Sequence, residues 1–410
     1  MLDITGQARW GILGDGQLAR MLALSAIPLG VRPIILTGDS SSPAGQTSPL
    51  FVRGHIDSRD DLHALLSQVD GAVIESEFVN CDLLESTGLA NKVVPSIAVI
   101  RVLQNKLEQK NLLQHLKIPT SPLFKQGSQE TQSWLKSISD NGTRPIVLKF
   151  ATLGYDGKGV LVLRGSGTSD LEAASDFVAL ATKRKIAVYA EDLVEFDREL
   201  AMLAVRRKDG EFKTWPLVIS EQKNGICDRV TGPATSLGVP KAHEVAAGIA
   251  CEKIASHLGI VGVFAVEFFL GVDGTLLVNE IAPRVHNSGH YSQNAGCTSQ
   301  FENHWRAALD LSLGSTDTMP FFAMQNILGP AEITSKECAH VPKGSEMAHV
   351  HWYAKRGISP GRKLGHLNGA CHDMSLSGDV LSALQASYGR WQDEQRHFFN
   401  PAESPRGAPK

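Results

Sequence analysis

Two glutamates lie on either side of a β-hairpin that the sequence predicts in the stretch FAVEFFLGVDGTLLVNEIA. The dipeptide Asp273-Gly274 is a strong signal for a two-residue hairpin turn. With that turn, Val272 pairs with Thr275, and counting outward places Glu267 opposite Glu280, with Cβ atoms about 5 Å apart. Two carboxylates so close in apolar strands need a cation or a shared proton. The pair predicts a Mg²⁺ site, because Mg²⁺ commonly takes one or two carboxylates plus substrate phosphates.

Two other interpretations of the carboxylate pair stay open at this point. In the first, one glutamate is exposed and pairs with a lysine. In the second, the two carboxyl groups do acid–base chemistry, as in glycosidases. The second interpretation leaves the lysines and the glycine-rich loop of the preceding region unexplained.

That preceding region carries groups that suit a nucleoside triphosphate. Lys149 ends the apolar strand PIVLK, and a lysine on a buried strand is rare without an anionic partner. The loop GYDGKG that follows can fold over phosphate, although a plain glycine-rich hairpin is the alternative. In AEDLVEFDRE, residues 191–194 offer backbone groups to an adenine edge, and Glu199 offers a carboxylate to ribose hydroxyls. Together with the carboxylate pair, these parts indicate ATP held between two sheets with Mg²⁺ on its phosphates.

A glycine-rich turn near the start, GILGDGQLAR, lies between a predicted strand and a predicted helix. Its spacing is G-x-x-G-x-G, and Ala19 stands where a dinucleotide fingerprint would place its third glycine. Asp39, after the next strand, is the candidate for a ribose-binding acid. A tight turn, a dinucleotide site and a site for another ligand at the helix N-terminus all remain open.

The segment EIAPRVHNSGH, residues 280–290, follows the second strand of the hairpin directly. It combines a carboxylate, an arginine, two histidines and an asparagine in eleven residues. A solvated loop has no need of such a mixture, so the segment is a candidate active-site loop.

The elements that position these groups fall into three regions. Residues 1–100 alternate strands and helices, which predicts a doubly wound parallel sheet. Residues 101–313 open with a helix, RVLQNKLEQKNLLQHLK, and continue with strands, including a segment at about 120–190 that we expect to form a lid. Residues 314–410 predict a small mixed β domain, and the tail FFNPAESPRGAPK is expected to fray. The fold class is α/β, in part α+β.

Composition excludes several classes of protein. The chain has 410 residues, 42% of them hydrophobic, and a formal net charge of −3, which argues against binding nucleic acid through overall charge. No apolar run approaches the length of a membrane span, and the N-terminus lacks the pattern of a signal peptide. The six cysteines are scattered without a CxxC motif, so we expect a cytoplasmic protein with reduced thiols.

With these residues in order, the chain resembles the ATP-grasp enzymes, and within them the N5-carboxyaminoimidazole ribonucleotide synthetases of purine biosynthesis. The resemblance covers roughly residues 9–368. Its most specific stretches are GILGDGQLARML, GYDGKG, NEIAPRVHNSGHYSQNAGCTSQFENHWRA and SPGRKLGHLN. It implies that ATP phosphorylates bicarbonate to carboxyphosphate, which then carboxylates the exocyclic amine of 5-aminoimidazole ribonucleotide. It also implies a homodimer.

The resemblance assigns a role to each matching residue. Glu267 and Glu280 match the Mg²⁺ ligands, in agreement with the hairpin. The positions that match contacts to ATP are Lys106, Lys149, Gly154, Gly157, Lys158, Gly159, Glu191, Asp192, Val194, Glu199, Gln222 and Asn279. A regular strand would point Asn279 away from the face that carries Glu280.

The remaining matches concern bicarbonate and the acceptor. Those assigned to the chemistry are Tyr155, Asp156, Arg284, His286 and Asn287. Those assigned to the acceptor are Gly16, Gln17, Leu18, Glu77, Lys355, Arg362 and Lys363. Of these, the last three would grip the 5′-phosphate, because Arg and Lys together suit a phosphate group. The glycine-rich turn would then serve the acceptor and not a dinucleotide.

The chain departs from the family's usual pattern at several positions. Asp15 and Ala19 stand where glycine is favoured, and Val79 where a second acid is usual. Ser220 and Gln222 replace a more common Asn and His. These changes concern the acceptor more than ATP.

Three competing functions were weighed. The first is the related ATP-grasp ligase that makes formylglycinamide ribonucleotide from formate, which RVHNSGH and SPGRKLGHLN disfavour. The second is a nicotinamide dehydrogenase, which the missing fingerprint glycine and the carboxylate pair disfavour. The third is a non-catalytic nucleotide-binding module, which the metal carboxylates and phosphate lysines disfavour.

Overall fold

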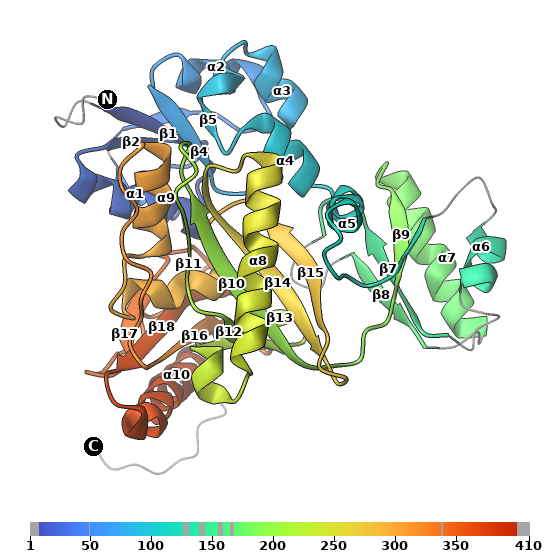
Figure 1. Cartoon of the computed structure of the whole chain (residues 1–410). Coiled ribbons are helices and arrows are strands. Elements are labelled where there is room, and N and C mark those ends of the chain that lie inside the picture. Colours follow the sequence, from blue (N-terminus) through green and yellow to red (C-terminus); the bar gives the residue numbers. More distant parts are fainter. Residues whose placement is uncertain are drawn as a thin grey trace.

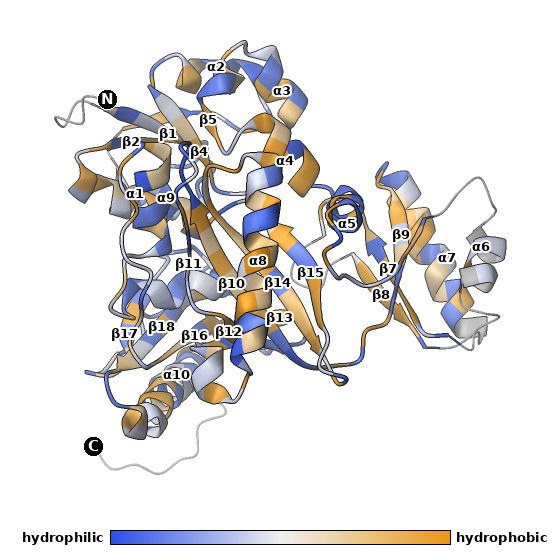
Figure 2. Cartoon of the chain, viewed as in Figure 1, coloured by the Kyte–Doolittle hydropathy of each residue, from blue (hydrophilic) through white to orange (hydrophobic). Residues whose placement is uncertain are grey.

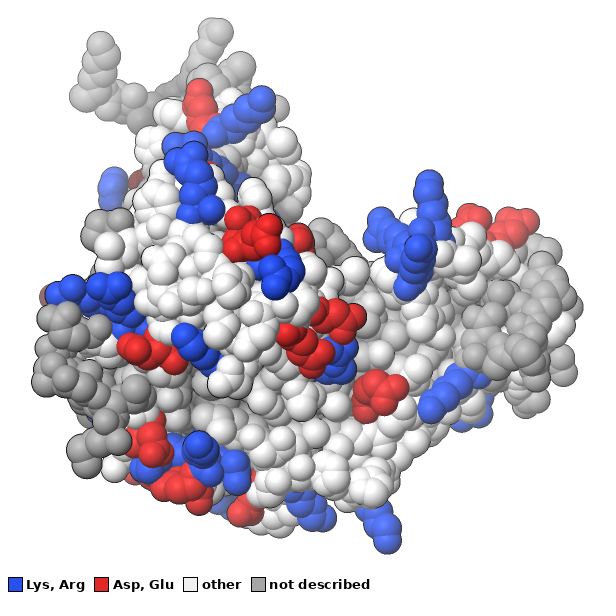
Figure 3. Space-filling view, turned by 90° about the horizontal axis from the view of Figure 1, so that it is seen from above, with Lys and Arg blue, Asp and Glu red and all other residues white. Residues whose placement is uncertain are grey.

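The computed structural model of the chain describes residues 8–48, 50–125, 131–138, 144–154, 159–164, 168–337 and 339–399. These residues form three sheets (Figure 1). None of the described helices is both long and apolar enough to cross a membrane. On the face drawn in Figure 3, basic and acidic side chains are interspersed, in keeping with a net charge near zero.

The N-terminal region is a five-stranded parallel sheet in the order β3-β2-β1-β4-β5, which confirms the predicted parallel sheet. Its inner strands are continuous apolar runs such as GAVI, because helices cover both faces. The strands are β1 (Arg9–Leu13), β2 (Arg32–Thr37), β3 (Phe51–Arg53), β4 (Gly71–Ile74) and β5 (Val93–Val94). The helices are α1 (Gln17–Ala26), α2 (Arg59–Leu66), α3 (Cys81–Ser86) and α4 (Ile97–Leu103).

The predicted helix over residues 101–117 is in fact broken. Helix α4 ends at Leu103, and α5 (Lys106–His115) starts a new axis. The break is at Asn105, whose side-chain oxygen accepts hydrogen bonds from the backbone N–H groups of Leu107 and Glu108, at 3.0 and 3.3 Å. An asparagine in this N-cap position stabilises a helix start, which the run of helix-forming residues around it concealed.

The predicted lid is a separate four-stranded antiparallel sheet in the order β6-β9-β7-β8. Helices α6 and α7 cover it, and Trp134 and Ala174 pack with Ile146 and Leu148 in its core. Figure 1 shows it standing beside the main body. The strands are β6 (Leu123–Lys125), β7 (Ile146–Phe150), β8 (Val160–Leu163) and β9 (Val188–Asp192), and the helices are α6 (Thr131–Ile138) and α7 (Thr168–Lys183).

The central sheet is antiparallel and nine-stranded, in the order β15-β14-β10-β12-β13-β16-β18-β17, with β11 paired to β10. Its middle strands are largely hydrophobic (Figure 2), and the buried apolar residues of α8 (Lys241–Leu258) pack on them. Helix α9 (Gln300–Ala308) packs β14 and β10 against α1. The strands are β10 (Phe196–Arg206), β11 (Phe212–Thr214), β12 (Val218–Lys223), β13 (Ile226–Gly232), β14 (Gly262–Gly271), β15 (Leu276–Ala282), β16 (Phe321–Leu328), β17 (His349–Trp352) and β18 (Lys363–Cys371).

The C-terminal region differs from the expected small mixed β domain. Its strands β16, β17 and β18 pair antiparallel and continue the central sheet from β13. A helix that the sequence analysis did not predict, α10 (Ser377–Phe399), then packs on β16 and β18. Phe398 and Phe399, which were assigned to the fraying tail, are its last turn, and Phe399 packs against the apolar core beneath it. Residues 400–410 lie outside the described part.

Candidate active site

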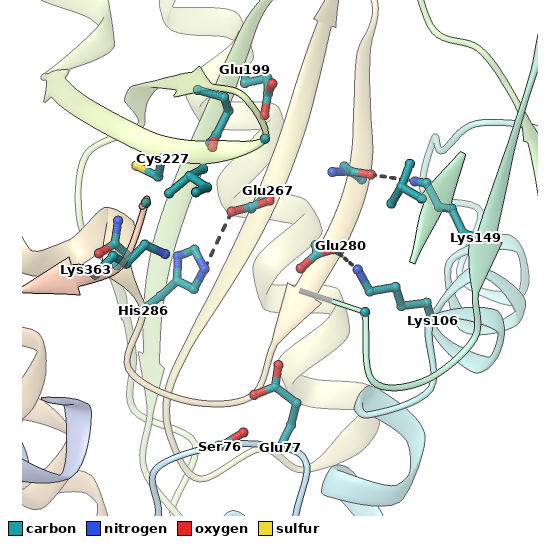
Figure 4. Close-up of a pocket in the computed structure, with 18 of the residues that line it drawn as sticks. Ser76, Glu77, Lys106, Lys149, Glu199, Cys227, Glu267, Glu280, His286 and Lys363 are labelled. Atoms are coloured by element: carbon teal, nitrogen blue, oxygen red, sulfur yellow. Dashed lines mark hydrogen bonds and ion pairs between the residues drawn. The ribbon is translucent and has the colours of Figure 1, made fainter. Parts of the chain in front are cut away.

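One cavity of about 870 Å³ contains most of the predicted site residues, and side chains from the N-terminal region, the lid and the central sheet line it (Figure 4). Gln17 and Glu77 come from α1 and the segment after β4 of the N-terminal region, Lys149 from the lid, and Glu267 and Lys363 from the central sheet. The cavity therefore lies where these three parts of the chain meet. Groups up to 346 residues apart in the sequence face one space, as between Gln17 and Lys363.

The carboxylate pair is confirmed, although the turn that predicted it is wrong in detail. Glu267 pairs directly with Glu280. The hairpin loop has three residues, because Gly271 N–H donates to the Thr275 carbonyl at 2.8 Å, and Gly274 adopts a positive φ of 81°. The register then shifts between Glu267 and Phe268, and this bulge cancels the extra loop residue.

The bulge also explains where Asn279 lies. In a regular strand it would face away from Glu280, yet both side chains line the cavity. Two residues of the bulged strand oppose one residue of its partner, which lets neighbours turn toward the same face. The Asn279 side-chain oxygen accepts a hydrogen bond of 3.2 Å from the Lys149 ammonium.

The two carboxylates have different partners and different protonation. Glu280 forms an ion pair with Lys106, which holds its pKa well below the usual range although burial acts in the opposite direction. Burial and the neighbouring Glu280 raise the pKa of Glu267. The ring nitrogen Nε2 of His286 lies 3.6 Å from Oε1 of Glu267, and the positive charges of Lys106 and Lys363 oppose the rise in the pKa of Glu267. Glu280 is therefore ionised, and ionisation of the neighbouring Glu267 is disfavoured.

A second charged cluster, which the sequence analysis only half found, lies where the lid meets α5. Glu191 is 2% exposed, and its carboxylate lies 3.1 Å from the Lys149 ammonium and 3.3 Å from that of Lys110. The Ser121 hydroxyl donates to it at 2.5 Å. Burial opposes ionisation, but the two lysines and the hydroxyl lower the pKa of Glu191. Because the Glu191 carboxylate already binds these three side chains, an adenine ring would form hydrogen bonds with the backbone of residues 192–194 and not with this carboxylate.

Above this cluster the cavity is apolar. Phe196 and Phe269 stack with ring centroids 4.7 Å apart, and the other apolar residues of this part are Val147, Val160, Val162, Leu193 and Val194. Glu199 lies at the edge of this slot, where burial and then the charge of Glu280 raise its pKa to about 7. Asp192 also lines the cavity and pairs with Arg144. The slot is the right kind of surface for a flat aromatic ring with polar groups at one rim.

The segment after β15 brings Arg284, His286 and Asn287 into the same cavity. The Arg284 guanidinium pairs with both carboxylate oxygens of Glu77. The ring Nδ1 of His286 accepts from the Ser288 N–H at 3.3 Å, so the neutral ring carries its proton on Nε2, which faces Glu267. Burial and the neighbouring Arg284 lower the pKa of His286 to about 3, so the ring is neutral.

The far end of the cavity is lined by the cations predicted for a phosphate, Lys355, Arg362 and Lys363. They lie on or beside the turn that precedes β18. Arg362 donates to the Gly357 carbonyl at 3.0 Å, which fixes the turn. Gln222, which also lines the cavity, donates to the Ser220 hydroxyl at 3.0 Å. The turn therefore presents its cations from a backbone that is already ordered.

The glycine-rich turn behaves differently from the expectation. Gln17 and Leu18 line the cavity, but the N–H of Gly16 donates to the Glu75 carboxylate at 2.7 Å. A side chain at Gly16 would place its Cβ 2.2 Å from that carboxylate, which would then have to move. The helix N-terminus is therefore occupied by a carboxylate of the chain itself. Asp39, the dinucleotide candidate, is exposed and bonds Ser41 outside the cavity.

Some predicted residues cannot be placed. Tyr155, Asp156, Gly157 and Lys158 lie outside the described residues. Gly154 lines the cavity, whereas Gly159 is held in the lid sheet, where its carbonyl accepts from the Phe150 N–H at 2.9 Å.

Several residues of the site and its surroundings were missed, among them Lys110, Glu75, Cys227 and the stacked pair of Phe196 and Phe269. Lys110, just outside the cavity, was detectable, because it lies four positions after Lys106 on one helix face. Glu75 and Cys227 line the cavity, and neither carried a signal beyond its residue type.

Comparison with known proteins agrees with this geometry. The sequence model of the ATP-grasp domain matches residues 111–301, that of the ribonucleotide synthetase preATP-grasp domain residues 8–104, and that of the phosphoribosylaminoimidazole carboxylase C-terminal domain residues 323–376. The fold and the site thus define an ATP-grasp enzyme.

Individual relatives narrow the assignment. The N5-carboxyaminoimidazole ribonucleotide synthase of Mycobacterium bovis is 36% identical over 393 residues, covering 93% of this chain and 88% of its own. The Aspergillus clavatus carboxyaminoimidazole ribonucleotide synthase, solved with ATP, is 31% identical with a TM-score of 0.82, covering 94% of this chain and 99% of its own. The same enzyme was solved with ADP and 5-aminoimidazole ribonucleotide, with a TM-score of 0.81 at 31% identity over the same shares. The chain belongs to the N5-carboxyaminoimidazole ribonucleotide synthase family.

Proposed function

We propose that the chain uses ATP and bicarbonate to carboxylate 5-aminoimidazole ribonucleotide to its N5-carboxyamino derivative, with release of ADP and phosphate. The observation that carries this proposal is the order of groups around one cavity. An apolar slot and a lysine cluster lie at one end, a carboxylate pair in the middle, and a phosphate-type cation cluster at the other end. A nucleoside triphosphate and a second phosphorylated substrate can thus share the space.

ATP fits the lid side of the cavity. The slot around Phe196 and Phe269 suits adenine, and the backbone from Asp192 to Val194 suits its polar edge. Glu199 would accept hydrogen bonds from the ribose hydroxyls. Lys106 and Lys149 would neutralise the phosphates.

Mg²⁺ fits the carboxylate pair. Glu267 and Glu280 supply oxygen ligands on one face, and Glu267 lacks a strong cationic partner. The described residues contain no group of three or more His, Cys, Asp or Glu arranged so that it could hold a metal ion by itself, so the ion would rely on phosphate oxygens and water for its other ligands. When bound, Mg²⁺ would supply charge neutralisation for phosphoryl transfer.

The chemistry then proceeds in two steps. A bicarbonate oxygen attacks the γ-phosphorus of ATP, the bond to ADP breaks, and carboxyphosphate forms. The exocyclic amine of the acceptor attacks the carboxyl carbon, phosphate leaves, and the amine loses one proton. The neutral His286 donates through Nε2 to an anion placed near Glu267, and Arg284 adds a fixed positive charge beside it. Both groups are aligned before the substrates arrive, so they need little reorganisation.

The acceptor fits the remaining end. Lys355, Arg362 and Lys363 would hold its 5′-phosphate, while Gln17, Leu18 and Glu77 line the route to the reaction centre. Because Glu75 already occupies the N-terminus of α1, a substrate phosphate is excluded there and directed to the cations.

The test is ADP release by the purified protein with Mg-ATP and bicarbonate, with and without 5-aminoimidazole ribonucleotide. Formate plus glycinamide ribonucleotide serves as the competing pair. Strong stimulation by the first pair alone supports the proposal. Stimulation by the second pair, or by neither, would mean that the departures at Asp15, Val79 and Ser220 have changed the acceptor. The homodimer and the cytoplasmic location stay predictions, which sedimentation and cell fractionation would check.

A further inference from the structure

Lys110 is a buried cation that the proposed reaction does not use directly. Its side chain is 1% exposed and does not line the cavity. The ammonium donates to the Thr120 hydroxyl at 2.7 Å, the Ser121 hydroxyl at 3.0 Å and the Val278 carbonyl at 3.4 Å. Such a complete set of partners fixes the position of the charge.

The surroundings of Lys110 join three parts of the molecule. Helix α5 carries the lysine, Glu191 belongs to β9 of the lid sheet, and Val278 belongs to β15 of the central sheet. The Thr120 hydroxyl also donates to the Val278 carbonyl at 2.7 Å, which ties the start of the lid to the central sheet. A change of charge at Lys110 would therefore affect both the lid and the central sheet, which lie on either side of the proposed ATP slot.

Charge counting gives the cluster a specific property. Glu191 carries one negative charge and contacts two ammonium groups, those of Lys110 and Lys149. The cluster thus has a net charge of +1. Lys149, which is 13% exposed, is the member that lines the cavity, so the surplus charge faces the ligand.

We propose that Lys110 is a positioning residue that neutralises Glu191, so that Lys149 is released to bind the phosphates of ATP. Without Lys110, Lys149 is the only cation on a buried carboxylate and is held there, because leaving it would expose an unpaired buried charge. This inference rests on the proposed binding of ATP in this cavity.

The proposal makes a prediction that a merely structural role does not. Lys110→Met reduces the cluster to zero net charge, whereas the double variant Lys110→Met/Glu191→Gln restores +1 and leaves Lys149 unbound by a carboxylate. We expect the single variant to bind ADP and a non-hydrolysable ATP analogue at least tenfold more weakly. It should bind adenosine, which has no phosphate, within twofold of the unaltered protein. The double variant should recover the nucleotides to within about threefold.

The measurement is calorimetric titration of each protein with adenosine, ADP and the analogue, after circular dichroism confirms folding. Lys253→Met, which removes an exposed lysine of α8, is the matched control for net charge. If the single variant does not fold, the comparison of the double variant with the unaltered protein still decides. Weak nucleotide binding by a folded double variant would overturn the proposal, as would an equal loss of adenosine and ADP in the single variant. If the unaltered protein binds no adenine nucleotide, the proposed function itself fails.

Discussion

The two charged clusters beside the ATP slot are built in opposite senses. At the lid, two lysines share one carboxylate, and the cluster of Lys110, Glu191 and Lys149 carries a surplus positive charge. On the central sheet, two carboxylates share one lysine, since Lys106 pairs with Glu280 and leaves Glu267 with a neutral histidine. One cluster is short of an anion and the other of a cation. A metal ion bound to a phosphate group would supply the missing cation and the missing anion together. The site is therefore complementary to the metal and the phosphate in combination, and not to either of them alone.

The largest effect should follow from breaking the carboxylate cluster. Glu280→Gln removes the carboxylate that stays ionised, and we expect turnover to fall by about 10³-fold or more because charge stabilisation in the transition state is lost. The fold should persist, since glutamine keeps the shape of the side chain. Steady-state kinetics measure the turnover, and thermal unfolding measures whether the fold persists. Glu252→Gln, an exposed change on α8, is the control, and full activity in Glu280→Gln would refute the metal assignment.

Breaking the lysine cluster should cost somewhat less. Lys149→Met removes the cation that faces the cavity, and we expect binding of ADP to weaken by about 100-fold, in the range of a lost charge-assisted contact. Adenosine binding should change little. Titration with adenosine and with ADP distinguishes a loss of binding to the phosphates from a loss of binding to the adenosine part. Parallel losses for adenosine and ADP would show that Lys149 supports the slot and not the phosphates.

A variant at the acceptor end should leave the ion pairs of both clusters in place. We expect Lys363→Met to raise the KM for 5-aminoimidazole ribonucleotide by about tenfold or more, because one phosphate cation is lost. The affinity for ADP should stay within twofold. Initial rates at varied acceptor concentration measure the first and calorimetry the second. The exposed Lys336→Met is the control, and an unchanged KM would place the acceptor phosphate elsewhere.

The smallest effect concerns the protonation of Glu199, which lines the same cavity as the clusters. Its folded pKa of about 7 is above the unfolded value of 4.5, so its contribution to stability is complete below pH 4.5 and is lost as pH rises through 7. Relative to Glu199→Gln, the ligand-free protein should lose about 1–2 kcal/mol between pH 5 and pH 8, a reduced figure because the side chain is partly solvated. Urea unfolding of both proteins at each pH tests this. A pH-independent difference would contradict the assignment.

The sequence predicted the carboxylate pair better than it predicted the hairpin that carries it. The pairing of Glu267 with Glu280 was correct because a longer loop and a bulge cancel, and neither is visible in the residues. Asn279 faces the cavity only because of that bulge, so a regular strand misplaced it.

Long-range contacts explain most of what could not be predicted. The strands and the parallel sheet followed from local patterns of apolar residues, whereas the joining of β13 to β16 depends on pairing across about a hundred residues. The hydrogen bond between Glu75 and the N-terminus of α1 is a similar case, since no local pattern in either segment predicts that the two come into contact. Lys110 was missed for a different reason, because a lysine in a helix is ordinarily a solvated residue.

The continuity of the central sheet has a consequence for which molecules the enzyme can accept. Glu280 on β15 and Lys363 on β18 are separated by six strand-to-strand steps, which would span about 29 Å in a flat sheet. Both line one cavity, so the sheet must curl around it. Because its strands are hydrogen-bonded to one another, the curled sheet is rigid. The distance from the carboxylate pair to the cations proposed to bind the acceptor phosphate is therefore also fixed. Under the proposed function, the sheet would favour acceptors in which the distance between amine and phosphate matches this fixed spacing.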